Sequence, residues 1–127
     1  MMQAHKQDHP MAEPGRVLAT AALRAAAMLG WTGRDLAEVI GSSESTVSRM
    51  ANGVRELPPQ SKPGQLAALV IRAYRSLDAL VGNDEARRLR WMGSYNAALG
   101  AIPRELMRTP EGLVRVVIYL DGARALA

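Results

Sequence analysis

The 127-residue chain is predicted to fold entirely into α-helices, about seven in number. Hydrophobic residues make up 48% of it, but aromatic residues only 4%, with no Phe. Ala, Leu, Val and Ile must therefore build the core, and an Ala-rich core favours closely packed helices over sheets. Helix start and stop signals also recur along most of the chain. Its length allows one domain or two very small ones.

The N-terminal segment gives a tail and then a first helix. Residues 1–14 show no apolar periodicity, and we expect a mobile tail. His5 and His9 have the i,i+4 spacing of metal ligands on a helix, but a proline follows directly and no acidic third ligand is in register, so no metal site is predicted. The helix should run from Gly15 to Gly30, where glycine is a good C-terminal cap.

Two short helices are predicted next, the first over residues 33–40. Thr32 is a good N-cap for it, and Asp35 three residues later is the acidic partner of a capping box. Ser42 or Ser43 caps the second helix, and an Asn-Gly pair ends it. The two helices are therefore separated by only a tight turn.

The spacing within this pair is that of a helix-turn-helix. Ala37 is small where the helices should cross, Gly41 allows a positive φ in the turn, and Val47 clamps the second helix to the core. We therefore assign residues 15–63 as a DNA-binding domain. The alternative is an ordinary αα-hairpin whose exposed face is polar only because it contacts solvent. The polar residues expected to contact base edges or phosphates are Arg34, Glu44, Ser45, Thr46, Ser48, Arg49, Asn52 and Arg55.

A linker and a connecting helix should follow. Three prolines within residues 54–64 predict a linker or domain boundary. The segment from Gln65 to Val81 has apolar residues at 3–4 spacing, which predicts one amphipathic helix. Residues 64–83 are accordingly assigned as a connecting helix that ends at Gly82.

Residues 84–127 are expected to form a second helical domain. Asn83 should cap its first helix, which is predicted to reach Gly100, and Pro103 should begin a short helical turn. Thr109-Pro110 then opens a last helix to about residue 125. Its VVIYL stretch would also suit a strand, but the cap signals favour a helix. One face of the first of these helices is predicted to carry Leu89, Met92, Asn96 and Leu99.

Both halves resemble parts of one protein family. Residues 33–53 resemble the Xre-type (Cro/repressor-like) helix-turn-helix. Glu44 is a departure from this family, because an acid at the tip of the recognition helix repels phosphate. Its carboxylate can, however, accept a hydrogen bond from cytosine N4. The C-terminal half resembles the toxin-binding domain of Xre/ParS/MbcA-type antitoxins. That resemblance rests on Asn96, Leu99-Gly100, Pro103 with Glu105-Leu106-Met107, and Thr109 with Glu111-Gly112. Gly100-Ala101 and Ile102-Pro103 depart from the Gly-Gly and Pro-Pro that the family often has.

The resemblance implies a type II antitoxin whose partners are a RES-domain toxin and operator DNA. The toxin would be an enzyme that consumes NAD or transfers ADP-ribose, and the antitoxin would occlude it sterically without a cofactor. As a homodimer it would also repress its own operon. On the last helix, the stripe Leu113, Val116, Val117 and Leu120 should face inward, which leaves Val114, Ile118 and Tyr119 for a neighbouring helix, a second copy or a partner. The expected toxin contacts are Arg115, Tyr119, Asp121 and Arg124.

Composition excludes several other functions. The absence of Cys excludes a disulfide scaffold and a thiol nucleophile, and it fits a cytoplasmic protein. No apolar run approaches the ~20 residues of a transmembrane helix, and neither a phosphate loop nor a nucleophile motif is present, so no enzyme is expected. The net charge of +4 is modest for a nucleic-acid binder. Two alternatives stay open: a stand-alone dimeric regulator without a toxin, and an interaction module that has lost DNA binding, which the modest charge and Glu44 would allow.

Overall fold

The computed structural model describes residues 13–126, and this part of the chain is entirely helical apart from its loops and one isolated bridge. The predicted all-α fold is confirmed. His5 and His9 lie outside the described residues. The seven helices are α1 (Pro14–Met28), α2 (Gly33–Ile40), α3 (Glu44–Ala51), α4 (Lys62–Val81), α5 (Glu85–Gly93), α6 (Pro103–Leu106) and α7 (Pro110–Leu126).

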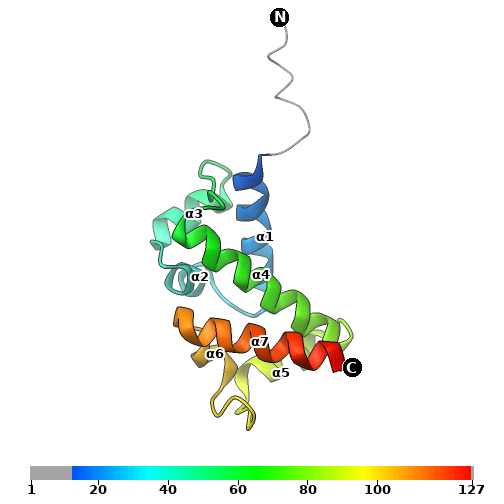
Figure 1. Cartoon of the computed structure of the whole chain (residues 1–127). Coiled ribbons are helices and arrows are strands. Elements are labelled where there is room, and N and C mark those ends of the chain that lie inside the picture. Colours follow the sequence, from blue (N-terminus) through cyan, green and yellow to red (C-terminus); the bar gives the residue numbers. More distant parts are fainter. Residues whose placement is uncertain (1–12, 127) are drawn as a thin grey trace, which may run out of the picture.

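The longest helix, α4, is shared by the two halves of the molecule. Figure 1 shows α1, α2 and α3 gathered around its N-terminal part, whereas α7 lies across its C-terminal part with α5 and α6 beneath. One continuous apolar core runs through both groups of helices. Because α4 is covered by α1 and by α7, it buries Val70 and Ile71 as well as Ala73 and Leu77, which is more than the single apolar face predicted from the sequence.

The proline-rich stretch predicted as a linker packs against α1. Leu57 is buried, and its backbone N–H donates to the Gly15 carbonyl oxygen at 3.0 Å. The helix that follows begins at Lys62, three residues earlier than predicted, because the Ser61 hydroxyl accepts from the Gly64 N–H and caps it. A Cβ on Gly64 would collide with the Pro58 carbonyl oxygen, so only glycine allows this close approach.

Helix α5 is shorter than predicted. Its N-cap is Asp84 rather than Asn83, which adopts a left-handed conformation with φ of 61°. The helix ends at Gly93, because Ser94 is extended. Asn96 therefore lies in the following loop, where its side chain accepts from the Leu99 N–H at 3.1 Å and its backbone pairs with Ala101. The prediction that Asn96 and Leu99 continue the helical face of Leu89 and Met92 is therefore wrong. The Asn96 side chain instead caps the turn that follows.

The last helix confirms the expected inward stripe. Leu113, Val116, Val117 and Leu120 are all buried against α4 and its neighbours. Gly112 is also buried, and a Cβ there would collide with the Leu106 carbonyl oxygen, so α6 and the start of α7 approach closely. The VVIYL stretch is helical, as the cap signals predicted.

A buried arginine that the sequence analysis did not single out joins three helices. The side chain of Arg88, on α5, is 1% exposed. Its Nε donates to the Met28 carbonyl oxygen at 2.8 Å, and its Nη1 donates to Asp78 Oδ1 at 2.8 Å. Its guanidinium also lies over the Tyr74 ring, 5.8 Å from the centroid. Arg88 thus joins the end of α1 and the C-terminal part of α4 to α5.

Arg88→Ala should therefore destabilise the fold severely. Breaking a buried ion pair by removing one partner typically costs about 3–5 kcal/mol, because the other partner is left uncompensated. Urea unfolding measures this loss. Arg87→Ala is the matched control, since Arg87 is exposed and its loss should cost no more than about 0.5 kcal/mol. Equal and small losses in both variants would contradict the role given to Arg88.

Candidate functional site

The helix-turn-helix is built on two capped helix starts. The Thr32 hydroxyl accepts from the Asp35 N–H at 3.1 Å, and the Asp35 carboxylate accepts from the Thr32 N–H at 2.9 Å, which is the predicted capping box. Gly41 ends α2 with φ of 72°, as expected for the turn. Of the two candidate caps for α3, Ser43 is the one used, because its hydroxyl accepts from the Thr46 N–H at 3.0 Å.

The capping box perturbs the ionisation of Asp35. The hydrogen bond from the Thr32 backbone N–H lowers the pKa of the Asp35 carboxyl below its ordinary value, and partial burial opposes this shift. The Thr32 hydroxyl and the positive charges of Arg108 and Arg104 lower the pKa further. Since both arginines belong to the α6 region, the C-terminal half contributes to the electrostatics at the start of α2.

The recognition helix, α3, is anchored on one side and free on the other. Val47 and Met50 are buried, and the small Ala37 of α2 is buried beside them in the core. Seven of the eight residues predicted to contact DNA are exposed, and the eighth, Thr46, is half-buried with its hydroxyl hydrogen-bonded by Ser43. The structure thus presents the predicted polar face of α3 to solvent.

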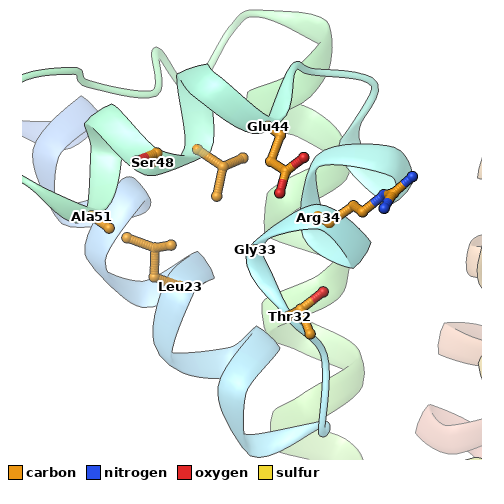
Figure 2. A pocket seen from close by; sticks show the side chains of 8 residues that line it. Leu23, Thr32, Gly33, Arg34, Glu44, Ser48 and Ala51 are labelled. Atoms are coloured by element: carbon orange, nitrogen blue, oxygen red, sulfur yellow. The ribbon is translucent and has the colours of Figure 1, made fainter.

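Part of this face borders an open hollow of about 520 Å³ between α1, α2 and α3. Figure 2 shows Glu44 and Ser48 on its α3 side, Gly33 and Arg34 on its α2 side, and the Arg34 guanidinium pointing away from it. We call this feature the α2–α3 hollow. Its lining residues are Leu23, Thr32, Gly33, Arg34, Glu44, Val47, Ser48 and Ala51.

The start of α1 brings Arg16, which the sequence analysis missed, next to the loop that follows α3. Arg55 shares a second, smaller hollow with Arg16 from the first turn of α1. Arg16 lies 4.0 Å from Glu56, and both side chains are well exposed. Arg16 could not be assigned from local spacing, because it is separated from the helix-turn-helix by most of α1.

The four residues predicted to contact a toxin all make contacts within the chain. Arg115 donates to the Leu99 carbonyl oxygen at 2.9 Å, and the Tyr119 ring stacks on Trp91 with centroids 6.4 Å apart. These contacts hold α7 against α5 and the loop that follows α5.

The other two predicted toxin contacts meet α4. Asp121 accepts from the Ser76 hydroxyl at 2.9 Å and pairs with Arg72 at 2.6 Å. Arg124 also donates to the Ser76 hydroxyl, at 3.2 Å. Ser76 is completely buried, so this polar cluster fixes the C-terminal part of α7 on α4.

The opposite side of α7 carries an exposed apolar strip. Val114 is 41% exposed and Ile118, one turn later, is 66% exposed. Tyr119, which the sequence analysis grouped with them, is instead covered by Trp91. We call the exposed side of the helix the α7 outer stripe. It consists of Glu111, Val114, Arg115, Ile118, Gly122 and Ala125.

Residues 13–126 hold no group of His, Asp and Glu side chains placed to ligate a metal. None of the helices in this part of the chain is long and apolar enough to cross a bilayer. The exposed side chains on α3 and α7 include guanidinium, hydroxyl, carboxylate and apolar groups.

Comparison with known families assigns both halves of the chain. The model of the antitoxin Xre-like helix-turn-helix domain matches residues 8–72. The model of the antitoxin Xre/MbcA/ParS C-terminal toxin-binding domain matches residues 76–125. A search of curated proteins found no match. The two matches meet inside α4, the helix shared by both halves of the fold. Neither family is an enzyme family.

The capping box should be worth a measurable part of the stability. Thr32→Ala removes the side-chain acceptor and is expected to lower the free energy of unfolding by about 1 kcal/mol at neutral pH, measured by urea denaturation. Thr20→Ala makes the same chemical change at an exposed position within α1 and should cost no more than about 0.5 kcal/mol. A Thr32→Ala variant as stable as the control would argue against the cap.

The contribution of Asp35 should depend on pH. Because its pKa is lowered in the folded protein, the carboxylate stabilises the fold fully above the ordinary value of 3.8, and this stabilisation is lost as the pH falls through the lower folded-state pKa. The stability difference between the wild type and Asp35→Asn should therefore narrow from about pH 5 to about pH 3. A constant difference across this range would contradict the assignment.

Proposed function

Since the chain belongs to the Xre-like helix-turn-helix antitoxin family, we propose that it neutralises a RES-domain toxin and represses its own operon. It is an antitoxin with a helix-turn-helix and a toxin-binding domain. We propose further that this toxin is an enzyme that consumes NAD or transfers ADP-ribose. The observation that carries the proposal is the succession of the two family matches on a single core.

We propose that the toxin docks on the α7 outer stripe. Val114 and Ile118 supply apolar area that no helix of the described chain covers, and buried apolar residues at the centre of an interface carry much of its binding energy. Arg115 belongs to this stripe, whereas Arg124 lies outside it, next to α4. Both are exposed, and each guanidinium has further N–H donors for acidic groups of the toxin. Tyr119 and Asp121 would serve mainly by holding this helix in place.

Inhibition by this surface would be steric. A helix that covers the entrance of the toxin's active site excludes substrate, and the antitoxin then needs no catalytic group of its own. This is consistent with a binding surface made of apolar and guanidinium groups. It also explains why a rigid α7 matters, because a docked helix that is already ordered loses less conformational entropy on binding.

Repression is proposed to use the exposed face of α3. In helix-turn-helix proteins the second helix lies in the major groove and its N-terminal residues contact base edges. The short polar groups on α3 suit base edges, whereas Arg34 and Arg49 suit phosphates or guanine. We propose that two copies bind together, since dimers of such domains read two half-sites about one helical turn apart.

Ile118→Asp should abolish neutralisation while the fold is kept, because it places a charge in the middle of the proposed apolar contact. Co-expression with the toxin of the adjacent gene measures this as loss of growth rescue and of co-purification. Val17→Asp is the control, since Val17 is 52% exposed on α1, outside the toxin-binding domain, and should rescue growth like the wild type. Full rescue by Ile118→Asp would exclude the α7 outer stripe as the docking surface.

Arg49→Ala should weaken binding to the DNA upstream of the gene by about tenfold or more, as expected for the loss of one specific guanidinium contact. Fluorescence anisotropy with a labelled duplex measures the change. Arg75→Ala removes an exposed arginine from α4, on the side that faces a separate hollow with α1, and should leave binding within about twofold of the wild type. Equal weakening in both variants would indicate only non-specific attraction.

A further inference from the structure

An acidic side chain stands at the tip of the helix that faces DNA in the proposed function. Glu44 is the first residue of α3 and is exposed. In Figure 2 its carboxylate is turned into the α2–α3 hollow, toward the first turn of α2. Recognition helices contact bases through their N-terminal residues, so this side chain stands where a base edge would be read.

The fold makes no visible use of this carboxylate. Ser43 already caps α3, and none of the ion pairs formed within residues 13–126 involves Glu44. Asp35, the acid in the first turn of α2, differs because it bonds back to Thr32 and so completes its own helix start. Glu44 makes no such bond in the described structure, and its carboxylate points away from its helix into the α2–α3 hollow.

An acid at this place also opposes general attraction to DNA. A carboxylate repels the phosphates that dominate non-specific affinity. It is an acceptor only, so it also repels guanine, which presents N7 and O6 acceptors in the major groove, and thymine, which presents O4. Adenine offers an amino donor, but with the N7 acceptor beside it. Cytosine is the base whose major-groove edge presents a donor alone, its N4 amino group.

We propose that Glu44 selects cytosine at one position of each operator half-site by accepting a hydrogen bond from its N4 amino group. This inference rests on the proposed DNA-binding function and deepens it. Glu44 lowers affinity for every other base at that position and restores it only for cytosine, so it acts as a specificity residue rather than an affinity residue. Ser48, one turn later on the same side of the hollow, belongs to the same reading surface.

Selection from a pool of random DNA duplexes with the full-length protein tests this directly. The wild type should enrich a sequence with cytosine at one position per half-site. Glu44→Gln should shift that position toward adenine, which glutamine recognises, and Glu44→Ala should leave it without preference. Glu44→Asp keeps the charge at the helix start but shortens its reach, and it should also lose the preference. All other positions should stay unchanged.

Glu85→Gln is the matched control. Glu85 is likewise the exposed first residue of a helix whose N-cap is already provided by another side chain, but it lies on α5. Its replacement removes the same charge from a helix start and should leave the selected sequence as it is in the wild type.

A modified base tests the contact atom itself. In N4-methylcytosine paired with guanine, a methyl group replaces the amino hydrogen that faces the major groove. At the selected position it should weaken binding of the wild type about tenfold and leave Glu44→Ala unaffected. A selected sequence that is the same in the wild type and all Glu44 variants would overturn this inference and leave the proposed function standing. If the wild type enriches no sequence at all, both this inference and the proposed repression of the operon fail.

Discussion

The buried guanidinium of Arg88 is the contact on which the arrangement of the two halves depends. From α5, this side chain donates a hydrogen bond to the Met28 carbonyl oxygen at the end of α1 and pairs with Asp78 on α4. A charge removed from water must be paired and hydrogen-bonded, so these partners are held at fixed distances. A second bridge, from Arg108 to Glu38 at 2.6 Å, joins the region after α6 to α2, but it is exposed and contributes little.

This constraint makes a DNA-binding domain and a toxin-binding domain parts of one body. The shared helix α4 packs against α1 and α2, which hold α3 at one end of the molecule, and against α7 at the other (Figure 1). The two proposed surfaces use different residues and different helices. In this account the antitoxin engages toxin and operator through separate faces, and the internal contacts of Arg115, Tyr119, Asp121 and Arg124 keep the toxin-binding helix in place.

Local signals predicted the helix-turn-helix well because caps and turns depend on neighbouring residues. The N-cap role of Thr32, the turn at Gly41 and the inward stripe of α7 can all be predicted from residue type and spacing alone. Arg88 could not be predicted in this way, because its partners lie 60 and 10 residues away. The predicted end of α5 was wrong because the helix stops where Ser94 is extended. The contacts that Arg115, Tyr119, Asp121 and Arg124 make within the chain depend on tertiary packing. The exposed face of α3 was predictable, whereas the hollow beside Glu44 was not.

Co-expression with the product of the adjacent gene would decide whether this chain acts as an antitoxin. Growth is scored first, and the purified proteins are then passed over a sizing column with light scattering. We expect the neighbouring product alone to arrest growth, this chain to restore it, and the two proteins to elute as one stable complex. A neighbouring product that is harmless and elutes separately would contradict the antitoxin assignment and would leave a stand-alone DNA-binding regulator as the better explanation.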